Sequence, residues 1–112
     1  MLTQGFGATY GRIMDADLKV RDNAESHAYE AVLDGEVVGT IAYTPVSPRH
    51  VVFRSTVVDP RLRGRGIGAL LVKAALDDVR AKGAAITSQC WFVDEFIAMY
   101  PEYADLLNSV PS

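Results

Sequence analysis

Three arginines and three glycines crowd into an eight-residue stretch near the middle of the chain. The arginines are Arg61, Arg63 and Arg65, and the glycines are Gly64, Gly66 and Gly68. A glycine lets a phosphate approach the backbone N–H groups, because no Cβ holds it off. A guanidinium adds a charged, fork-shaped contact that matches phosphate oxygens. The spacing therefore indicates a binding site for a phosphate-bearing ligand.

The elements on either side of this turn would place it well for that purpose. Residues 50–58 are rich in β-branched residues and predict a strand. Residues 66–82 carry apolar side chains at helical spacing, and Gly83 is a suitable helix end. The turn would then lie at the start of a helix, where unpaired N–H groups and the positive end of the helix dipole face the ligand.

Two common phosphate-binding motifs also contain a glycine-rich turn before a helix. A P-loop needs a lysine directly after its last glycine, and the first lysine after residue 64 is Lys73. Residues 64–69 formally match the dinucleotide-binding pattern Gly-x-Gly-x-x-Gly/Ala. The acidic residue expected about 20 positions later is missing, since residues 88–90 read Ser-Gln-Cys. The sequence therefore excludes a P-loop and disfavours a dinucleotide fold.

The remaining periodicities predict an α+β fold with a mixed, mostly antiparallel sheet and a β-α-β cofactor-binding core. A strand at 18–23 precedes two strands joined by an Asp34-Gly35 hairpin turn. The strands at 50–58 and 84–89 would be parallel, because a helix connects them. A short helix from residue 91 stops before Pro101, and another helical turn follows. Residues 1–17 are expected to form a flexible arm and residues 18–112 the domain.

Composition narrows the class of protein. At 112 residues and 49% hydrophobic, the chain suits one compact domain. A net charge of −3 argues against nucleic-acid binding, and no apolar run is long enough to span a membrane. Together with a single cysteine, this predicts a cytoplasmic protein. The sequence does not set the oligomeric state, and a monomer and a homodimer are both left open. Asp77 and Asp78 are expected on a solvated helix face, and no metal site is expected.

The segment "RLRGRG", residues 61–66, matches the Arg/Gln-x-x-Gly-x-Gly/Ala signature of the GNAT superfamily of N-acetyltransferases. "GRGIGALLVKAALDDVRAKG" and "CWFVDEFIAMYPEYADLL" resemble a small, single-domain GNAT-like subfamily that carries a Cys-x-Phe-Val motif. The resemblance extends from about Leu18 to Asn108. It implies an N-acetyltransferase that uses acetyl-CoA to acetylate an amine, on either a small molecule or a protein or peptide.

The same resemblance assigns cofactor contacts. The pyrophosphate of coenzyme A would lie on the N–H groups of residues 63–68, which include Ile67, with Arg61 beside it. The pantetheine arm would follow the strand at 50–58 and bind main-chain groups of Val57 and Val58. Leu62 and the Ile67 side chain are expected to pack.

Catalytic residues are harder to assign. Cys90 matches the cysteine of the subfamily, and it could accept the acetyl group, line the acetyl pocket or simply pack. Tyr100 and Tyr103 are candidate acids toward the leaving sulfur, or packing residues. Related sequences often carry His and Glu where this chain has Ser55 and Val57, and His where it has Tyr100. An alternative is therefore a non-catalytic acyl-CoA-binding module that has lost its acid-base residues.

Residues 91–112 contain four acidic side chains and no lysine or arginine. The acidic residues are Asp94, Glu95, Glu102 and Asp105. They could form a rim that attracts an amine, or they could be ordinary acidic helix surface. His27 and His50 are isolated, and no role is assigned to either.

Overall fold

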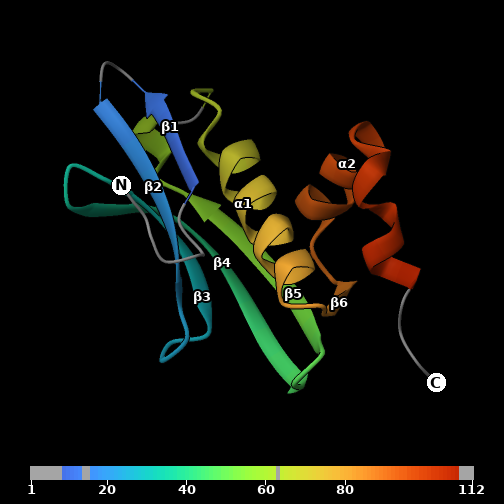
Figure 1. Ribbon diagram of the computed structural model, residues 1–112. Coiled ribbons are helices and arrows are strands. Elements are labelled where there is room, and N and C mark those ends of the chain that lie inside the picture. The colour runs from blue at the N-terminus through green and yellow to red at the C-terminus, as the bar shows by residue number, and fades with distance from the viewer. Residues whose placement is uncertain (1–8, 14–15, 63, 109–112) are drawn as a thin grey trace.

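The computed structural model describes residues 9–13, 16–62 and 64–108, and it contains one six-stranded sheet in the order β1-β2-β3-β4-β5-β6 (Figure 1). The strands are β1 (Thr9–Ile13), β2 (Ala16–Asn23), β3 (Ala28–Leu33), β4 (Glu36–Ser47), β5 (His50–Val58) and β6 (Ala85–Ser88). The helices are η1 (Pro60–Leu62), α1 (Ile67–Ala81), α2 (Trp91–Met99) and η2 (Pro101–Asn108). The predicted α+β class is confirmed.

The strand directions follow from how the strands are connected. Strands β1 to β5 form an antiparallel meander, whereas β5 and β6 are parallel because α1 connects them. The hairpin between β3 and β4 turns at Asp34 and Gly35, whose φ angles are 52° and 81°. Both residue types tolerate positive φ, so the predicted Asp-Gly turn and mixed sheet are confirmed.

The sheet extends further toward the N-terminus than the sequence analysis expected. Strand β2 begins at Ala16, two residues before the predicted start, and β1 pairs with it from Thr9↔Val20 to Ile13↔Ala16. The scattered glycines of this stretch gave no strand signal, because backbone pairing with β2 does not require apolar alternation. The proposed boundary between an arm and the domain remains a prediction, and residues 1–8 lie outside the described part of the chain.

Helix α1 lies across one face of the sheet, and α2 and η2 lie beyond it near β6 (Figure 1). The apolar side of α1 packs on inward-facing side chains of the strands to form the core. The fully buried members include Leu18, Val20, Ile41, Phe53, Leu71, Val72, Leu76 and Ile86. The helix ends as predicted, since Gly83 has φ 69° and donates its N–H to the carbonyl of Arg80.

Asp78 corrects one sequence prediction, because it is 1% exposed and does not lie on a solvated face. Its Oδ2 accepts a hydrogen bond from the Tyr29 hydroxyl at 2.5 Å and pairs with the Lys82 ammonium at 2.8 Å. Lys82 also pairs with Asp22, which accepts a bond from the Tyr43 hydroxyl at 2.6 Å. Tyr29 and Lys82 thus bind one oxygen of a carboxylate that helical periodicity alone would place in water, whereas its other oxygen, Oδ1, is buried without a hydrogen-bond partner among the described residues.

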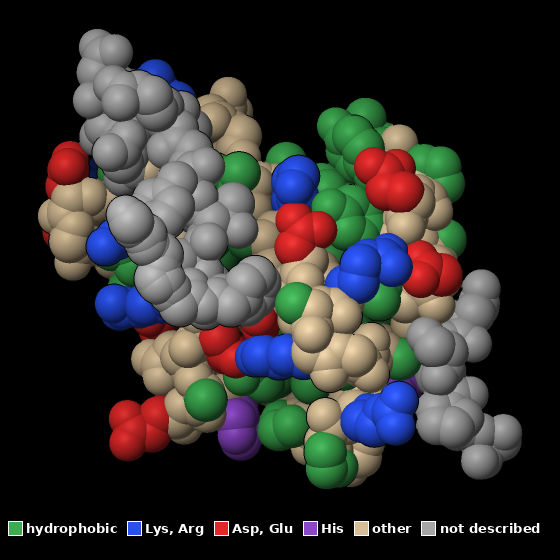
Figure 2. Space-filling view, in the orientation of Figure 1, with side chains coloured by type: hydrophobic (Ala, Val, Ile, Leu, Met, Phe, Trp, Pro, Cys, Tyr) green, Lys and Arg blue, Asp and Glu red, His purple; other side chains and the backbone are tan. Residues whose placement is uncertain are grey.

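Figure 2 shows acidic and basic side chains side by side on one face of the molecule, with apolar side chains gathered over α2. Several of these charges form ion pairs, including Lys73 with Asp77 at 2.9 Å and Arg80 with Asp105 at 2.8 Å. No helix in the described part of the chain is long and apolar enough to cross a membrane.

Candidate functional site

Strands β5 and β6 separate after only four pairs. They are paired from His50↔Ala85 to Phe53↔Ser88, and the last contact is the Gln89 N–H donating to the Phe53 carbonyl at 2.8 Å. Beyond this point β5 continues to Val58 with β4 as its partner on one side, and the chain after β6 turns away into α2. The other backbone edge of β5 therefore faces an opening rather than a strand.

A β-bulge lies at the point of separation. Ala42 of β4 pairs with Ser55 and Tyr43 pairs with Phe53, so Arg54 is an extra residue of β5. A bulge bends its strand and increases the local twist. It therefore accounts for the divergence of β5 from the short strand β6.

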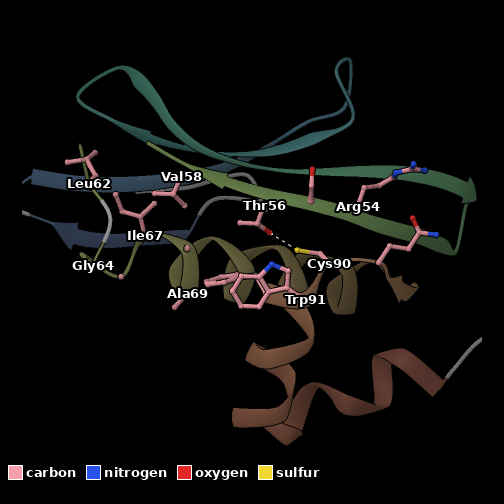
Figure 3. Close-up of a pocket in the computed structure, with 14 residues that line it drawn as sticks. Arg54, Thr56, Val58, Leu62, Gly64, Ile67, Ala69, Cys90 and Trp91 are labelled. Atoms are coloured by element: carbon pink, nitrogen blue, oxygen red, sulfur yellow. Dashed lines mark hydrogen bonds between the residues drawn. The ribbon is translucent and has the colours of Figure 1, made fainter. Parts of the chain in front are cut away.

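The opening leads into a cavity of about 570 Å³ (Figure 3). Three segments line it: β5 on one side, the start of α2 on the other, and the glycine-rich turn with the start of α1 at one end. The lining residues are Arg54, Ser55, Thr56, Val58, Leu62, Gly64, Gly66, Ile67, Gly68, Ala69, Gln89, Cys90, Trp91 and Phe92. The structure thus brings the turn and Cys90 into one cavity.

Two glycines of the turn are required by the backbone. Gly64 and Gly66 both have φ 81°, a left-handed conformation that favours glycine. A Cβ built on either residue would have no neighbour within 4 Å, so the space beside this backbone is open. Gly66 caps α1 without any side-chain hydrogen bond, and the first N–H groups of the helix have no helical acceptor. The turn thus leaves open space beside backbone donors that have no helical acceptor.

Gly68 has a different role from the one its place in the motif suggests. A Cβ at this position would lie 2.7 Å from Cζ of Phe92, closer than side chains normally approach. Gly68 therefore allows the start of α2 to pack against the start of α1. Because Phe92 follows Cys90 by two residues, this packing also fixes the position of the cysteine beside the cavity.

The arginines of the turn make different contacts. The guanidinium of Arg61 binds the carboxylate of Asp59, with Nη2 and Oδ2 2.7 Å apart, and hydrogen bonds from Arg61 lower the pKa of Asp59 to about 2. Asp59 in turn raises the pKa of Arg61. Arg65 is exposed and does not line the cavity, and Arg63 lies outside the described residues. In this structure the backbone of the turn, rather than the Arg61 guanidinium, faces the cavity.

Some apolar residues near the turn line the cavity, and one does not. Val58, Leu62 and Ile67 line the cavity, and Ile67 is buried in the core as expected. The side chain of Val57 is 61% exposed and does not line the cavity, so this residue could contribute there only through its main chain.

Cys90 is the N-cap residue of α2 and is 6% exposed. Its Sγ lies 3.3 Å from Oγ1 of Thr56 on β5, and this contact spans the opening between the two strands (Figure 3). The Ser88 hydroxyl accepts a hydrogen bond from the Cys90 N–H and donates one to the Cys90 carbonyl. The sulfur is thus held at the cavity wall by partners on both sides.

Tyr100 and Tyr103 do not lie in the same cavity as Cys90. They line a second hollow between α1 and the segment after α2, together with Lys73. The Tyr103 hydroxyl donates a hydrogen bond to Asp77 Oδ1 at 2.7 Å, and burial with this bond raises its pKa. Tyr100 is 43% exposed. The structure therefore does not bring the two predicted acids to the predicted nucleophile.

The four predicted rim carboxylates also lie away from the cavity lining. Asp105 is bound by Arg80 through both of its oxygens, at 2.8 and 2.9 Å, and this pairing lowers the pKa of Asp105. Arg80 also donates to the carbonyl of Glu102. Arg80 thus attaches η2 to α1 through the Asp105 carboxylate and the Glu102 backbone.

Sequence reasoning missed several lining residues. Arg54, Thr56, Gln89 and Trp91 were not singled out as site residues, although Thr56, Gln89 and Trp91 each directly neighbour a predicted one and Arg54 lies three positions before Val57. Alternation along β5 could have identified Thr56, since it lies on the same strand face as Val58. Trp91 is 69% exposed, and a large exposed aromatic side chain beside a cysteine was an available signal.

Comparisons with known proteins agree with this architecture. A family model described as GCN5-related N-acetyl-transferase matches residues 28–106. Protein NATD1 from Bos taurus is 34% identical over 70 residues, which cover 61% of this chain and 62% of NATD1. The chain therefore matches less than two thirds of the length of this relative.

Two solved structures are similar. Ard1 from Thermoplasma volcanium aligns with a TM-score of 0.52 at 26% identity, over 73% of this chain and 56% of Ard1. The aminoglycoside acetyltransferase meta-AAC0020, from an uncultured soil metagenomic sample and solved in complex with trehalose, aligns with a TM-score of 0.47 at 20% identity. That alignment covers 76% of this chain and 59% of the enzyme.

The sheet with its separated parallel pair thus has the fold of an N-acetyltransferase. Since the family model covers well over half of the sequence, the chain belongs to the GCN5-related N-acetyltransferase family. The superfamily inferred from "RLRGRG" is confirmed, and acyl transfer is the general chemistry of the family. Membership of the Cys-x-Phe-Val subfamily remains a prediction.

Proposed function

We propose that the chain binds acetyl-CoA in the cavity between β5 and α2 and transfers its acetyl group to an amine, in the cytoplasm. The observation that carries this proposal is the separation of β5 from β6. It leaves a backbone edge of β5 free to bind an extended chain, and this edge runs toward the glycine-rich turn. A long ligand with a phosphate at one end would satisfy both features.

The residues present fit this cofactor. The open space beside Gly64 and Gly66 admits a pyrophosphate to the N–H groups of residues 64–68, at the positive end of α1. Arg65 and Arg63 would add positive charge around it, and Arg61 could join them only by leaving Asp59. Main-chain groups of Val57 and Val58 would bind the pantetheine arm.

Bound acetyl-CoA supplies an acetyl group activated as a thioester. The protein must then orient this group, stabilise the developing oxyanion and handle the protons of the amine. A backbone N–H of β5 near Val57 or Val58 could serve the oxyanion.

Cys90 would take part in one of two ways. As a thiolate it would attack the acetyl carbon, form a thioester on its own sulfur as the sulfur of coenzyme A leaves, and later lose the acetyl group to the amine. Alternatively it would line the acetyl pocket while the amine attacks directly. Tyr100 and Tyr103 remain candidate acids only if the leaving sulfur reaches their hollow, which the cavity around Cys90 does not include.

One observation favours the alternative of a non-catalytic acyl-CoA-binding module. Among the described residues, no histidine, aspartate or glutamate lines the cavity. Ser55 lies in it where related sequences often carry histidine, so a side-chain base is not evident there. Such a module would bind the cofactor and leave the acetyl group in place.

The test is an assay for release of free coenzyme A, combined with mass spectrometry of the intact protein. The protein is incubated with acetyl-CoA and a panel of primary amines, beside the variants Cys90→Ala and Cys90→Ser. Turnover of an amine that both variants lose, together with an acetyl adduct on Cys90, supports the covalent route. Turnover retained by both variants supports direct transfer. If the protein binds acetyl-CoA but acetylates none of the amines, the result supports the non-catalytic acyl-CoA-binding module.

A further inference from the structure

Among the described residues, Arg54 has the only charged side chain that lines the cavity. It lies at the opposite end from Gly64, and Thr56 and Cys90 lie between them (Figure 3). A phosphate bound at the glycine-rich turn would therefore be held by groups other than Arg54. Arg54 is available for a ligand that reaches Cys90 from the end where β5 and β6 separate.

The position of Arg54 follows from the bulge. As the extra residue of β5, it has no counterpart on β4, and it directly follows the last residue paired with β6. Bulges next to active sites commonly redirect a side chain. Gln89, whose N–H makes the last contact to β5, lies across the opening and adds a neutral amide to the same end of the cavity.

The contacts of Arg54 differ from those of five other cations. Arg21, Arg61, Lys73, Arg80 and Lys82 each pair with a carboxylate at 3.0 Å or less. Within the described ranges, the contact recorded for the Arg54 guanidinium is a bond from Nη1 to the Thr44 hydroxyl at 3.4 Å. A guanidinium has five N–H donors, so most of them remain available to a bound anion.

We propose that Arg54 selects the acceptor by binding a carboxylate that the acceptor amine carries. This inference rests on the proposed function, since it assumes that the amine reaches the acetyl group near Cys90. It differs from the acidic rim expected from the sequence, because the charge that lines the cavity is positive. The substrate class is thus an amino acid or a short peptide with a free carboxylate, rather than a polycationic amine.

The geometry also limits the spacing between amine and carboxylate. Arg54 and Thr56 are two residues apart on β5, a separation of about 6–7 Å along a strand. The Arg54 side chain points away from Cys90 (Figure 3). A carboxylate on this guanidinium is therefore too far from Cys90 for the amine of an α-amino acid to reach the acetyl group. An acceptor with several bonds between its amine and its carboxylate would span the distance.

The experiment compares ω-amino acids of increasing length, from glycine upward, with their carboxamides. For wild-type protein we expect kcat/KM for the longer acids to exceed that for the matched amides by about tenfold to a hundredfold. In Arg54→Gln this ratio should fall to about one. The matched control is Arg49→Gln, which removes the same charge from an exposed residue outside the cavity and should keep the wild-type ratio.

Equal kcat/KM values for acids and amides in wild-type protein would overturn the inference, as would an equal loss for both in Arg54→Gln. If no amine is turned over, the proposed catalysis has failed, and the inference is then judged by binding. Calorimetric titration of the coenzyme A complex with the acids and amides would show tighter binding of the acids in wild-type protein only. No such difference would overturn the selective role of Arg54 as well.

Discussion

The two ends of α1 differ in whether their polar groups have partners within the protein. At its N-terminal end, Gly66 caps the helix without a side-chain hydrogen bond, beside a cavity and with open space around the backbone. At its C-terminal end, Asp78 is buried and bound by Tyr29 and Lys82. Donors at the first end have no helical acceptor and are proposed to bind a ligand, whereas at the second end polar groups on α1 bind partners from the sheet.

The difference explains how one helix can serve a binding site without becoming unstable. The polar groups of the C-terminal end attach α1 to β2 and β3, and the apolar face of α1 fills the core. This attachment holds the helix in place while its first turn presents unpaired N–H groups. Changes at the C-terminal end should therefore alter stability, and changes at the turn that precedes α1 should mainly alter binding.

The largest effect is expected from Asp78→Ala. Removing this carboxylate leaves the buried Tyr29 hydroxyl without its acceptor and takes one of two anions from Lys82. We expect the free energy of unfolding to fall by about 3–5 kcal/mol, as measured by urea denaturation. Asp105→Asn is the control, because its pair with Arg80 is exposed and should contribute about 1 kcal/mol or less. Similar losses for the two variants would contradict the comparison.

Gly68→Ala should act at the junction between α1 and α2. The added methyl group would meet the Phe92 ring at 2.7 Å and must push the start of α2 away. We expect a loss of about 1–3 kcal/mol in thermal or urea unfolding, together with greater reactivity of Cys90 toward a thiol reagent. Phe92→Leu in the same chain should restore part of both properties. Unchanged stability and thiol reactivity in Gly68→Ala would show that this packing is not tight.

The C-terminal network should also show a smaller pH dependence. Burial and hydrogen bonds to Asp78 and Asp77 raise the pKa of Tyr29 and Tyr103, respectively. Tyrosine in the unfolded chain ionises near pH 10, while these two stay protonated to higher pH. Their contribution to stability is thus fully present below about pH 10 and is lost as the pH rises toward the folded pKa values.

The measurement is the urea midpoint between pH 8 and 11, with tyrosinate absorbance followed in parallel. Tyr29→Phe should reduce the alkaline fall of the midpoint relative to wild-type protein. A midpoint that stays constant over this range in wild-type protein would count against the raised pKa values.

The sequence predicted the N-terminal end of α1 better than its C-terminal end. The Asp34-Gly35 hairpin depends on local residue types and the parallel strand pair on the helix that connects the strands, and both have the predicted conformation. The glycine-rich turn lies at the start of α1, as predicted. The burial of Asp78 could not be predicted in this way, because its partners Tyr29 and Asp22 (through Lys82) come from distant strands. Strand β1 was missed for a similar reason, since pairing rather than side-chain pattern defines it.

The candidate site was predicted in part. Cys90 and the turn lie in one cavity, but Tyr100 and Tyr103 line another, and nothing in their spacing revealed that the chain after α2 turns back toward α1. The role of Gly68 depends on a ring that lies 24 residues later in the sequence, at Phe92. The place of Arg54 in the cavity could not be predicted, because it depends on the bulge and on the separation of β5 from β6.

Calorimetric titration of wild-type protein and Gly66→Val with acetyl-CoA tests the central claim most directly. Valine strongly disfavours the φ of 81° at this position, and its side chain would occupy the open space in front of the helix N–H groups. The account predicts saturable binding to wild-type protein and affinity at least about tenfold lower for the variant, with the fold intact by circular dichroism. No binding to wild-type protein, or equal binding to both, would contradict the assignment of this turn as the phosphate site.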